Sequence, residues 1–189
     1  DYPWRSRAKM HFKESFPNIW RGGVLNPYIR SNYLERKQTT LEAKEFFGGR
    51  TPRISNKFPT IKVPSINCYE VLDAFETYRP DVGVVYGTGK ISENVFSWPT
   101  YGLINAHGGI LPEYRGLDTN LWAIYERQFD KVGVTIHRVD SELDTGDVLK
   151  ISQLPLAKGM SISNLRYHTS IICTDLLLST LEDLKRGRL

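Results

Sequence analysis

The chain has 189 residues, which is enough for one domain of ordinary size and too few for two. Hydrophobic residues make up 40% and charged residues 24%, and no apolar run approaches the roughly 18 residues that cross a membrane, so we expect no membrane span. Two cysteines, Cys68 and Cys173, are too few for a disulfide scaffold or a four-cysteine zinc site. They favour a reducing compartment, and we expect a cytoplasmic protein.

The formal net charge of +4 is distributed unevenly. Residues 1–62 carry 13 Lys and Arg against 5 acidic residues, a net +8, whereas residues 63–189 carry 12 against 16, a net −4. A basic stretch rich in aromatic residues fits a solvated surface, a site for a small anion such as a nucleotide diphosphate, or a nucleic-acid surface. We do not expect nucleic acid as the partner, but a non-catalytic basic binding module stays open as an alternative.

The sequence of the N-terminal third indicates little regular structure before residue 32. In chain order we expect irregular structure over residues 1–30, a helix over 32–47 that Gly48-Gly49 ends, a polar loop over 51–58, a short strand over 60–63, and a helix that Asn67 caps and Pro80 ends. An open α/β sheet usually begins with an apolar strand and a Gly-rich turn. Residues 1–30 supply neither, so we expect that the first βαβ unit is missing from this sequence.

Strands and helices alternate in the rest of the chain. We expect strands over residues 81–87, 101–106, 132–139 and 148–154, a short helix near 92–96, a helix from Asp118 or Thr119 to about 127, and a long helix from Ser161 to Gly187. The alternation predicts a Rossmann-like α/β fold, that is, a mostly parallel sheet with flanking helices. We divide this single domain into a basic, partly helical segment over residues 1–59 and a core over residues 60–189.

Asn105 and His107 are the strongest candidates for catalytic residues. They lie two residues apart on a predicted strand, so their side chains point to the same face at its C-terminal end, where open α/β sheets place ligands. An amide beside an imidazole can hold a developing oxyanion while the imidazole moves a proton. The pair Gly108-Gly109 then lets backbone or substrate approach closely. A strand-end histidine that only packs is the alternative.

An acidic loop, DSELDTGD, covers residues 140–147. It does not fit a calcium loop, because its glycine falls at position 7 rather than 6 and position 12 is Ile151 rather than Glu. The loop is therefore either a solvated turn or a segment that folds over the strand end, where Asp144 would orient His107. A neighbouring carboxylate would favour the protonated form of His107.

Other chemistries find little support. The sequence has no G-x-S-x-G nucleophile elbow and no Walker A motif, and Gly87-Thr88-Gly89 lacks the third glycine of a dinucleotide fingerprint. The four histidines have no cysteine close in sequence, so we expect no metal site. Thr135 and His137 share one face of their strand, and they are either structural or in second-layer contact with the site.

Three motifs in this order resemble the 10-formyltetrahydrofolate-dependent formyltransferases over about residues 60–189: INAHGGILPEYRG at 104–116, GVTIH at 133–137 and DTGD at 144–147. The resemblance implies that Asn105, His107 and Asp144 form the catalytic trio of a catalytic core, and that 10-formyltetrahydrofolate donates the formyl group without a metal. It also implies two pterin-binding walls, made by Tyr86, Gly87, Thr88, Gly89, Lys90 and Ile91 and by Val139, Asp140 and Leu143. In the family, Pro and often Ser follow the Asn-x-His sequence, and here Gly108 and Gly109 replace them.

The resemblance also suggests an acceptor. The basic, helical segment ending EFFGG looks like members that formylate nucleotide-linked amino sugars, as in lipopolysaccharide O-antigen biosynthesis, and we expect such a sugar as the partner. Members that act on methionyl-tRNA carry a further C-terminal domain, and those that act on glycinamide ribonucleotide begin with a Gly-rich phosphate loop. Glycinamide ribonucleotide, another amine, or water in a formyl-folate hydrolase stay open as alternative acceptors. The oligomeric state is open, with a homodimer as the candidate.

The expected mechanism is direct transfer. The acceptor amine attacks the formyl carbon, and Asn105 and protonated His107 stabilise the oxyanion. Asp144 helps to relay the amine proton to the folate nitrogen that leaves.

Overall fold

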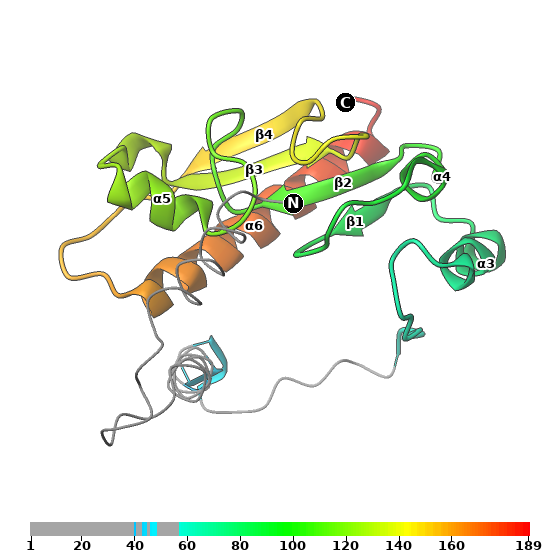
Figure 1. Cartoon of the computed structure of the whole chain (residues 1–189), viewed down its shortest axis with the longest axis horizontal. Helices are drawn as coiled ribbons and strands as arrows, with labels where there is room; N and C mark the ends of the chain where they lie inside the picture. Colours follow the sequence, from blue (N-terminus) through cyan, green and yellow to red (C-terminus); the bar gives the residue numbers. More distant parts are fainter. Residues whose placement is uncertain (1–39, 41–42, 45, 49–56) are drawn as a thin grey trace, which may run out of the picture. The chain divides into compact units, whose positions relative to one another are not determined.

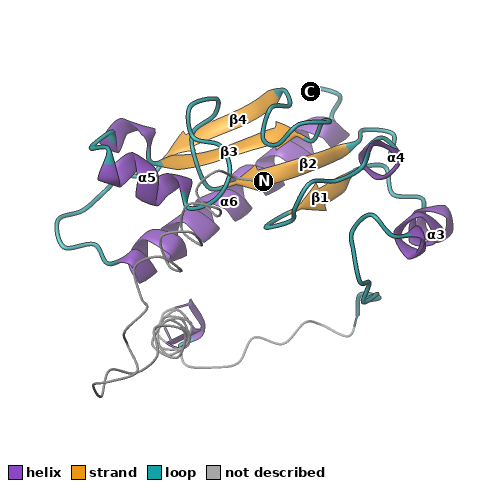
Figure 2. Ribbon diagram, in the orientation of Figure 1, coloured by secondary structure: helices purple, strands orange, loops and turns teal. Residues whose placement is uncertain are grey.

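The computed structural model describes residues 40, 43–44, 46–48 and 57–189. The chain divides into two units, residues 1–51 and 52–189, and the sheet and helices that follow belong to the second. In chain order they are α3 (Tyr69–Tyr78), β1 (Gly83–Val85), α4 (Glu93–Phe96), β2 (Leu103–His107), α5 (Thr119–Tyr125), the 3-10 helix η1 (Phe129–Lys131), β3 (Gly133–Arg138), β4 (Val148–Gln153) and α6 (Ile162–Lys185) (Figures 1 and 2). The predicted division at residue 59 into a basic segment and a catalytic core stays a prediction.

The four strands form one sheet in the order β1-β2-β3-β4. The predicted α/β fold with flanking helices is confirmed, but the predicted mostly parallel pairing is wrong for these strands. Only β1 and β2 pair in parallel, and both other pairs are antiparallel. Residues 108–132 leave β2 and enter β3 at the same end of the sheet, so the presence of α5 between them does not produce a parallel crossover. A short loop without a helix joins β3 to β4, which favours an antiparallel pair.

The side chains of β2 and β3 alternate between an apolar and a polar face, because successive residues of a strand point to opposite sides. The apolar set packs against α6, which crosses one face of the sheet in Figure 1, and consists of Ile104, Ala106, Val134 and Ile136 with Cys173 and Leu184. The intervening residues are Asn105, His107, Thr135 and His137. The candidate site residues therefore lie on the face of the sheet opposite α6.

Two further apolar clusters attach the remaining helices. Val71 of α3 and Val95 of α4 pack with Val85 and Leu103 at the β1 side of the sheet. Ala123 of α5 packs with residues on the other side, Tyr114, Val132, Leu154 and Leu165. These clusters fix the loops that follow β1 and β2, and those loops carry candidate site residues.

The predicted capping residues had different outcomes. Ser161 caps α6 as predicted: its hydroxyl accepts the backbone N–H of Asn164, whose side chain accepts the N–H of Ser161 in return. Asn67 does not cap α3 as predicted, because the N-cap residue of α3 is Cys68. The Asn67 amide instead donates to the carbonyl of Lys90, and its oxygen accepts the N–H of Ser92, so it holds the loop that follows β1.

The predicted strand over residues 60–63 is wrong, because these residues are mostly exposed and pair with no described strand. Within the predicted helix over 32–47, the described residues 40, 43–44 and 46–47 are helical, and the rest lies outside the described residues. The predictions for residues 1–30 and for most of the loop over 51–58 also lie outside them. No helix in the described part of the chain is long and apolar enough to cross a membrane.

Candidate active site

The site is built on the antiparallel pairing of β2 with β3. Its register places Asn105 opposite His137 and His107 opposite Thr135. Because the four residues share one face, the pairing alone brings an amide and two imidazoles together. Asp144 reaches the same place from the loop between β3 and β4. Of the two interpretations of the acidic loop, this is the one in which the loop folds over the strand end.

Asn105 is the hub of the network. Its side-chain Nδ2 lies 3.1 Å from Nε2 of His137 and donates to Oδ1 of Asp144 at 3.3 Å. Nδ1 of His137 lies 2.8 Å from the carbonyl oxygen of Arg138, and because a carbonyl only accepts, that nitrogen carries the ring proton. Nε2 of His137 also lies 3.5 Å from Oδ1 of Asp144. When Nε2 carries no proton, it accepts the second amide proton of Asn105, and both protons of the amide are then used within the site.

His107 lies behind this network and is 6% exposed. Its Nε2 donates to the carbonyl of Tyr114 at 2.8 Å, and its Nδ1 lies 3.6 Å from Oδ2 of Asp144. Burial lowers the pKa of His107 below its ordinary value, although the Asp144 charge and the Tyr114 carbonyl oppose this shift. The expectation that Asp144 keeps His107 protonated is therefore wrong: burial outweighs the carboxylate, and the neutral ring presents the lone pair of Nδ1 to Asp144.

Asp144 is also buried, at 8% exposure, and stays ionised. Burial acts to raise its pKa, but the contact with His137 and the backbone N–H of Gly116 outweigh burial and lower it. The Gly116 N–H donates to Oδ2 at 2.8 Å. This bond joins the end of the LPEYRG motif to the DTGD motif, and it explains why two distant segments of sequence contribute to one site.

Thr135 supports the loop after β2 and does not reach the pocket. Its hydroxyl donates to the carbonyl of Gly109 at 2.7 Å and accepts the N–H of Leu111 at 3.1 Å. The side chain is fully buried. Thr135 therefore shapes the segment that follows His107.

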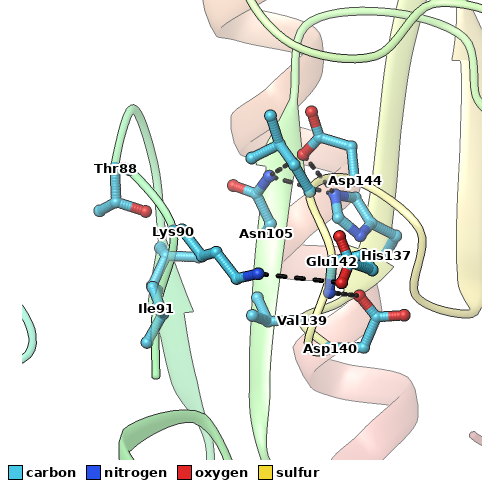
Figure 3. Close-up of a pocket in the computed structure, with 12 residues that line it drawn as sticks. Thr88, Lys90, Ile91, Asn105, His137, Val139, Asp140, Glu142 and Asp144 are labelled. Carbon is cyan, nitrogen blue, oxygen red and sulfur yellow. Dashed lines mark hydrogen bonds and ion pairs between the residues drawn. The ribbon is translucent and has the colours of Figure 1, made fainter. Parts of the chain in front are cut away.

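A pocket of about 370 Å³, including the space at its open mouth, lies beside Asn105. It is lined by Val85, Thr88, Gly89, Lys90, Ile91, Asn105, His137, Val139, Asp140, Glu142, Leu143 and Asp144. Figure 3 shows Asn105 between two walls, with Lys90 extending from one of them towards Glu142 on the other. Their charged atoms lie 3.8 Å apart, and both side chains are highly exposed. Its lining includes the buried apolar residues Val85 and Ile91, and Val85 lies opposite Asn105 in the sheet.

Seven of the nine residues predicted for the two pterin walls line this pocket: Thr88, Gly89, Lys90, Ile91, Val139, Asp140 and Leu143. Gly87 does not line it. Tyr86 lies in a separate hollow with Val84, Ala106 and residues of α6. Since Val85 points into the pocket, strand alternation turns Val84 and Tyr86 to the opposite face.

The structure adds residues that sequence reasoning missed. Val85 and Glu142 line the pocket, and His137, predicted as a second-layer residue, reaches it directly, whereas His107 does not line it. The available signal for His137 was the likeness of two short segments, N-x-H at 105–107 and T-x-H at 135–137. Antiparallel pairing of their strands sets Asn105 against His137.

The arrangement is suited to moving protons and polarising a carbonyl. A buried carboxylate lies against two imidazoles and an amide, and three of these four groups line one pocket. The described residues hold no group of His, Cys, Asp or Glu suited to a metal ion. No Ser or Cys is among the residues that line the pocket.

Comparison with known proteins gives a consistent result. Residues 37–177, about three quarters of the chain, match the formyl transferase family. The methionyl-tRNA formyltransferase of Desulfotalea psychrophila is 33% identical over 130 residues, which are 68% of this chain and 40% of that protein. The chain thus spans about two fifths of the length of this curated relative.

Two solved structures share the fold. HypX from Aquifex aeolicus, solved in complex with tetrahydrofolic acid, is 27% identical with a TM-score of 0.54, over 63% of this chain and 21% of that one. The formyltransferase PseJ from Anoxybacillus kamchatkensis is 23% identical with a TM-score of 0.53, over 63% of this chain and 71% of that one, and was solved with UDP-4,6-dideoxy-4-formamido-L-AltNAc and tetrahydrofolate. With most of its length matched and its motifs gathered at one pocket, the chain belongs to the formyl transferase family.

Proposed function

We propose that this chain carries the active site of an enzyme that transfers a formyl group from 10-formyltetrahydrofolate to an amine. The contact set of Asn105, His137 and Asp144 beside a partly apolar pocket carries the proposal, within a segment that matches the family. HypX, a relative of 27% identity, binds tetrahydrofolic acid, which supports a folate ligand.

The chemistry of the pocket lining suits a pterin. It combines apolar walls with a few polar groups, as small-molecule sites do. Val85, Ile91 and Val139 belong to one apolar cluster and would contact the flat faces of the ring. Backbone groups of the loop over 139–144 would contact its polar edge. The bound donor supplies the reactive formyl carbon and a nitrogen leaving group.

Asn105, His107 and Asp144 are the proposed catalytic residues. The Asn105 amide would donate a hydrogen bond to the formyl oxygen as negative charge develops there. This bond would replace the longer of its two present contacts, the 3.3 Å bond to Asp144. Asp144 faces the pocket and would take the amine proton as the new N–C bond forms, then return it to the folate nitrogen as the old bond breaks. His107, through Nδ1 at 3.6 Å, would share that proton with Asp144.

For the acceptor, we propose a nucleotide-linked amino sugar. The first 62 residues carry a net +8. A nucleotide diphosphate brings at least two negative charges, which a basic protein attracts. The likeness to PseJ establishes the fold only, and on that fold PseJ binds a UDP-linked formamido sugar together with tetrahydrofolate.

An aminoacyl-tRNA is the second candidate acceptor. The observation in its favour is the name of the curated relative, which is a methionyl-tRNA formyltransferase at 33% identity. A tRNA is also a polyanion, so the charge of the N-terminal third does not separate the two candidates.

The test offers the full chain 10-formyltetrahydrofolate with one acceptor at a time: a UDP-linked 4-amino sugar, the free amino sugar, methionyl-tRNA, glycinamide ribonucleotide, or water alone. Tetrahydrofolate formation gives the rate, and mass spectrometry of the acceptor identifies the product. We expect formylation of the UDP-linked sugar and little of the free sugar. Formylation of methionyl-tRNA alone would replace the acceptor, release of formate would indicate a hydrolase, and no folate binding at all would favour the basic binding module.

A further inference from the structure

Thr119 makes an unexpected contact with the segment that follows His107. It is the first residue of α5 and is 3% exposed. The sequence predicts it, or Asp118, as a helix cap, yet neither side chain makes a capping bond. The Thr119 hydroxyl instead donates to the carbonyl of Gly108.

Two threonines from different elements therefore hold two consecutive carbonyls. Thr119 of α5 holds Gly108, and Thr135 of β3 holds Gly109 with a bond of 2.7 Å. Both glycines directly follow His107. At the far end of the same loop, the Tyr114 carbonyl accepts the Nε2–H of His107 at 2.8 Å. The loop thus begins and ends at the imidazole, and Thr119 holds its beginning.

The space at the two glycines shows what lies between Thr119 and the imidazole. A Cβ added at Gly109 would lie 2.6 Å from Oγ1 of Thr119 and 2.9 Å from Nε2 of His107. A Cβ added at Gly108 would make its closest contact with Cγ2 of Thr169, at an ordinary 3.5 Å. Of the two glycines, only Gly109 has both the hydroxyl and the ring this close, so Thr119 and His107 both border the space that a side chain at position 109 would fill.

We propose that Thr119 is a positioning residue for His107. Its hydroxyl fixes Gly108-Gly109, and this glycine pair in turn holds the imidazole so that Nε2 meets the Tyr114 carbonyl and Nδ1 faces Asp144. This also accounts for the departure from the family pattern noted in the sequence: a side chain at position 109 would occupy the space that Thr119 and His107 use. The inference deepens the proposed function, but only its kinetic readout depends on that function.

The first test compares Thr119→Val, which keeps the branched shape and removes the hydroxyl, with Thr119→Ser, which keeps the hydroxyl. Nitrogen NMR of histidine-labelled protein reports which ring nitrogen of His107 carries the proton. We expect the wild type and Thr119→Ser to show protonated Nε2 alone, and Thr119→Val to show a mixture of both tautomers. With an active acceptor, kcat of Thr119→Val should fall on the order of 10- to 100-fold while the KM for the donor stays the same.

A second pair guards against a variant that does not fold. Gly109→Ala should disturb the His107 signals in the same way, whereas Gly108→Ala should leave them as in the wild type. The proposal is overturned if Thr119→Val lowers the melting temperature but leaves the His107 signals unchanged, if Thr119→Ser behaves like Thr119→Val, or if Gly108→Ala and Gly109→Ala have equal effects. Absence of formyl transfer by the wild type would reject the proposed function and leave the NMR comparison decisive for this inference.

Discussion

Asn105 and His137 occupy directly opposed positions on β2 and β3, and the amide nitrogen of the first lies 3.1 Å from the ring Nε2 of the second. The Arg138 carbonyl fixes a proton of His137 on Nδ1. In the neutral ring, Nε2 therefore has no proton and accepts a hydrogen bond. His137 therefore determines which way the Asn105 amide points, and with it the direction of the group proposed to polarise the formyl carbonyl.

This relationship predicts the effect of removing the acceptor. His137→Phe keeps a flat ring but cannot accept a hydrogen bond, so the Asn105 amide loses one of its two partners and its orientation. We expect formyl transfer to slow by about 100-fold. His137→Gln, which retains an acceptor, should recover part of the rate. Steady-state kinetics with the best acceptor provide the measurement, and equal rates for the two variants would contradict the orienting role.

Asn105 itself can be tested with a matched pair. Asn105→Ala removes the proposed oxyanion donor and should cost on the order of 100-fold or more in kcat. Asn105→Asp keeps the shape but places a second carboxylate 3.3 Å from the Asp144 position, where like charges repel, and should be no more active. A loss of only tenfold in Asn105→Ala would reduce Asn105 to a residue that positions its neighbours.

The pocket predicts where a folate ligand protects the backbone. Tetrahydrofolate should slow hydrogen exchange at the amides of residues 88–91 and 139–144, because these two segments form the walls. Mass spectrometry of peptides after exchange provides the readout. Residues 148–153 of β4, which do not line the pocket, serve as the internal control. Protection confined to β4 or to the N-terminal 50 residues would place the ligand elsewhere.

The lowered pKa of His107 predicts a pH dependence of stability. Below its ordinary pKa of about 6.5 the unfolded chain binds a proton that the buried ring binds less readily. The unfolded state then holds more protons, so the free energy of unfolding should fall as the pH drops through about 6.5 towards 5. Urea titrations over this range measure the slope. It should become shallower in His107→Gln, and an unchanged slope in that variant would assign the pH dependence to another group.

Gly146 of the DTGD motif predicts a stability effect of steric origin. A Cβ at this position would come within 2.8 Å of the carbonyl carbon of Arg138, so Gly146→Ala must move the loop that carries Asp144. Overpacking of this kind costs about 1–3 kcal/mol. Gly89→Ala meets nothing within 4 Å and is the matched control for stability. Thermal unfolding measures the melting temperature of both variants, and we expect a lower value for Gly146→Ala than for Gly89→Ala. Equal melting temperatures would show that the loop adapts freely.

Much of this architecture follows from local sequence patterns. The four central strands, the long helix after Ser161 and the return of the acidic loop to the strand end all depend on periodicity, capping residues or motif order, which are local signals. Strand direction is different, because an intervening helix favours a parallel neighbour without requiring one. The antiparallel β2–β3 pair therefore did not follow from the alternation of elements.

The errors at the site have equally specific causes. Tyr86 follows Val85, and the pleat of the strand sends the two side chains to opposite faces, so the predicted wall cannot begin at Tyr86. The protonation of His107 depends on how deeply the ring is buried, and that burial comes from residues distant in sequence. Thr119 looks like a helix cap by position, and only the folded loop shows its bond to Gly108.

The alternation along β2 and β3 ties catalytic competence to correct folding. A slip of β3 by one residue against β2 would turn His137 towards α6 and Ile136 towards the pocket side. Such a species would lose part of its apolar core at the same moment as its active site. Misregistered molecules should therefore be unstable and subject to degradation, rather than persist as folded but inactive protein.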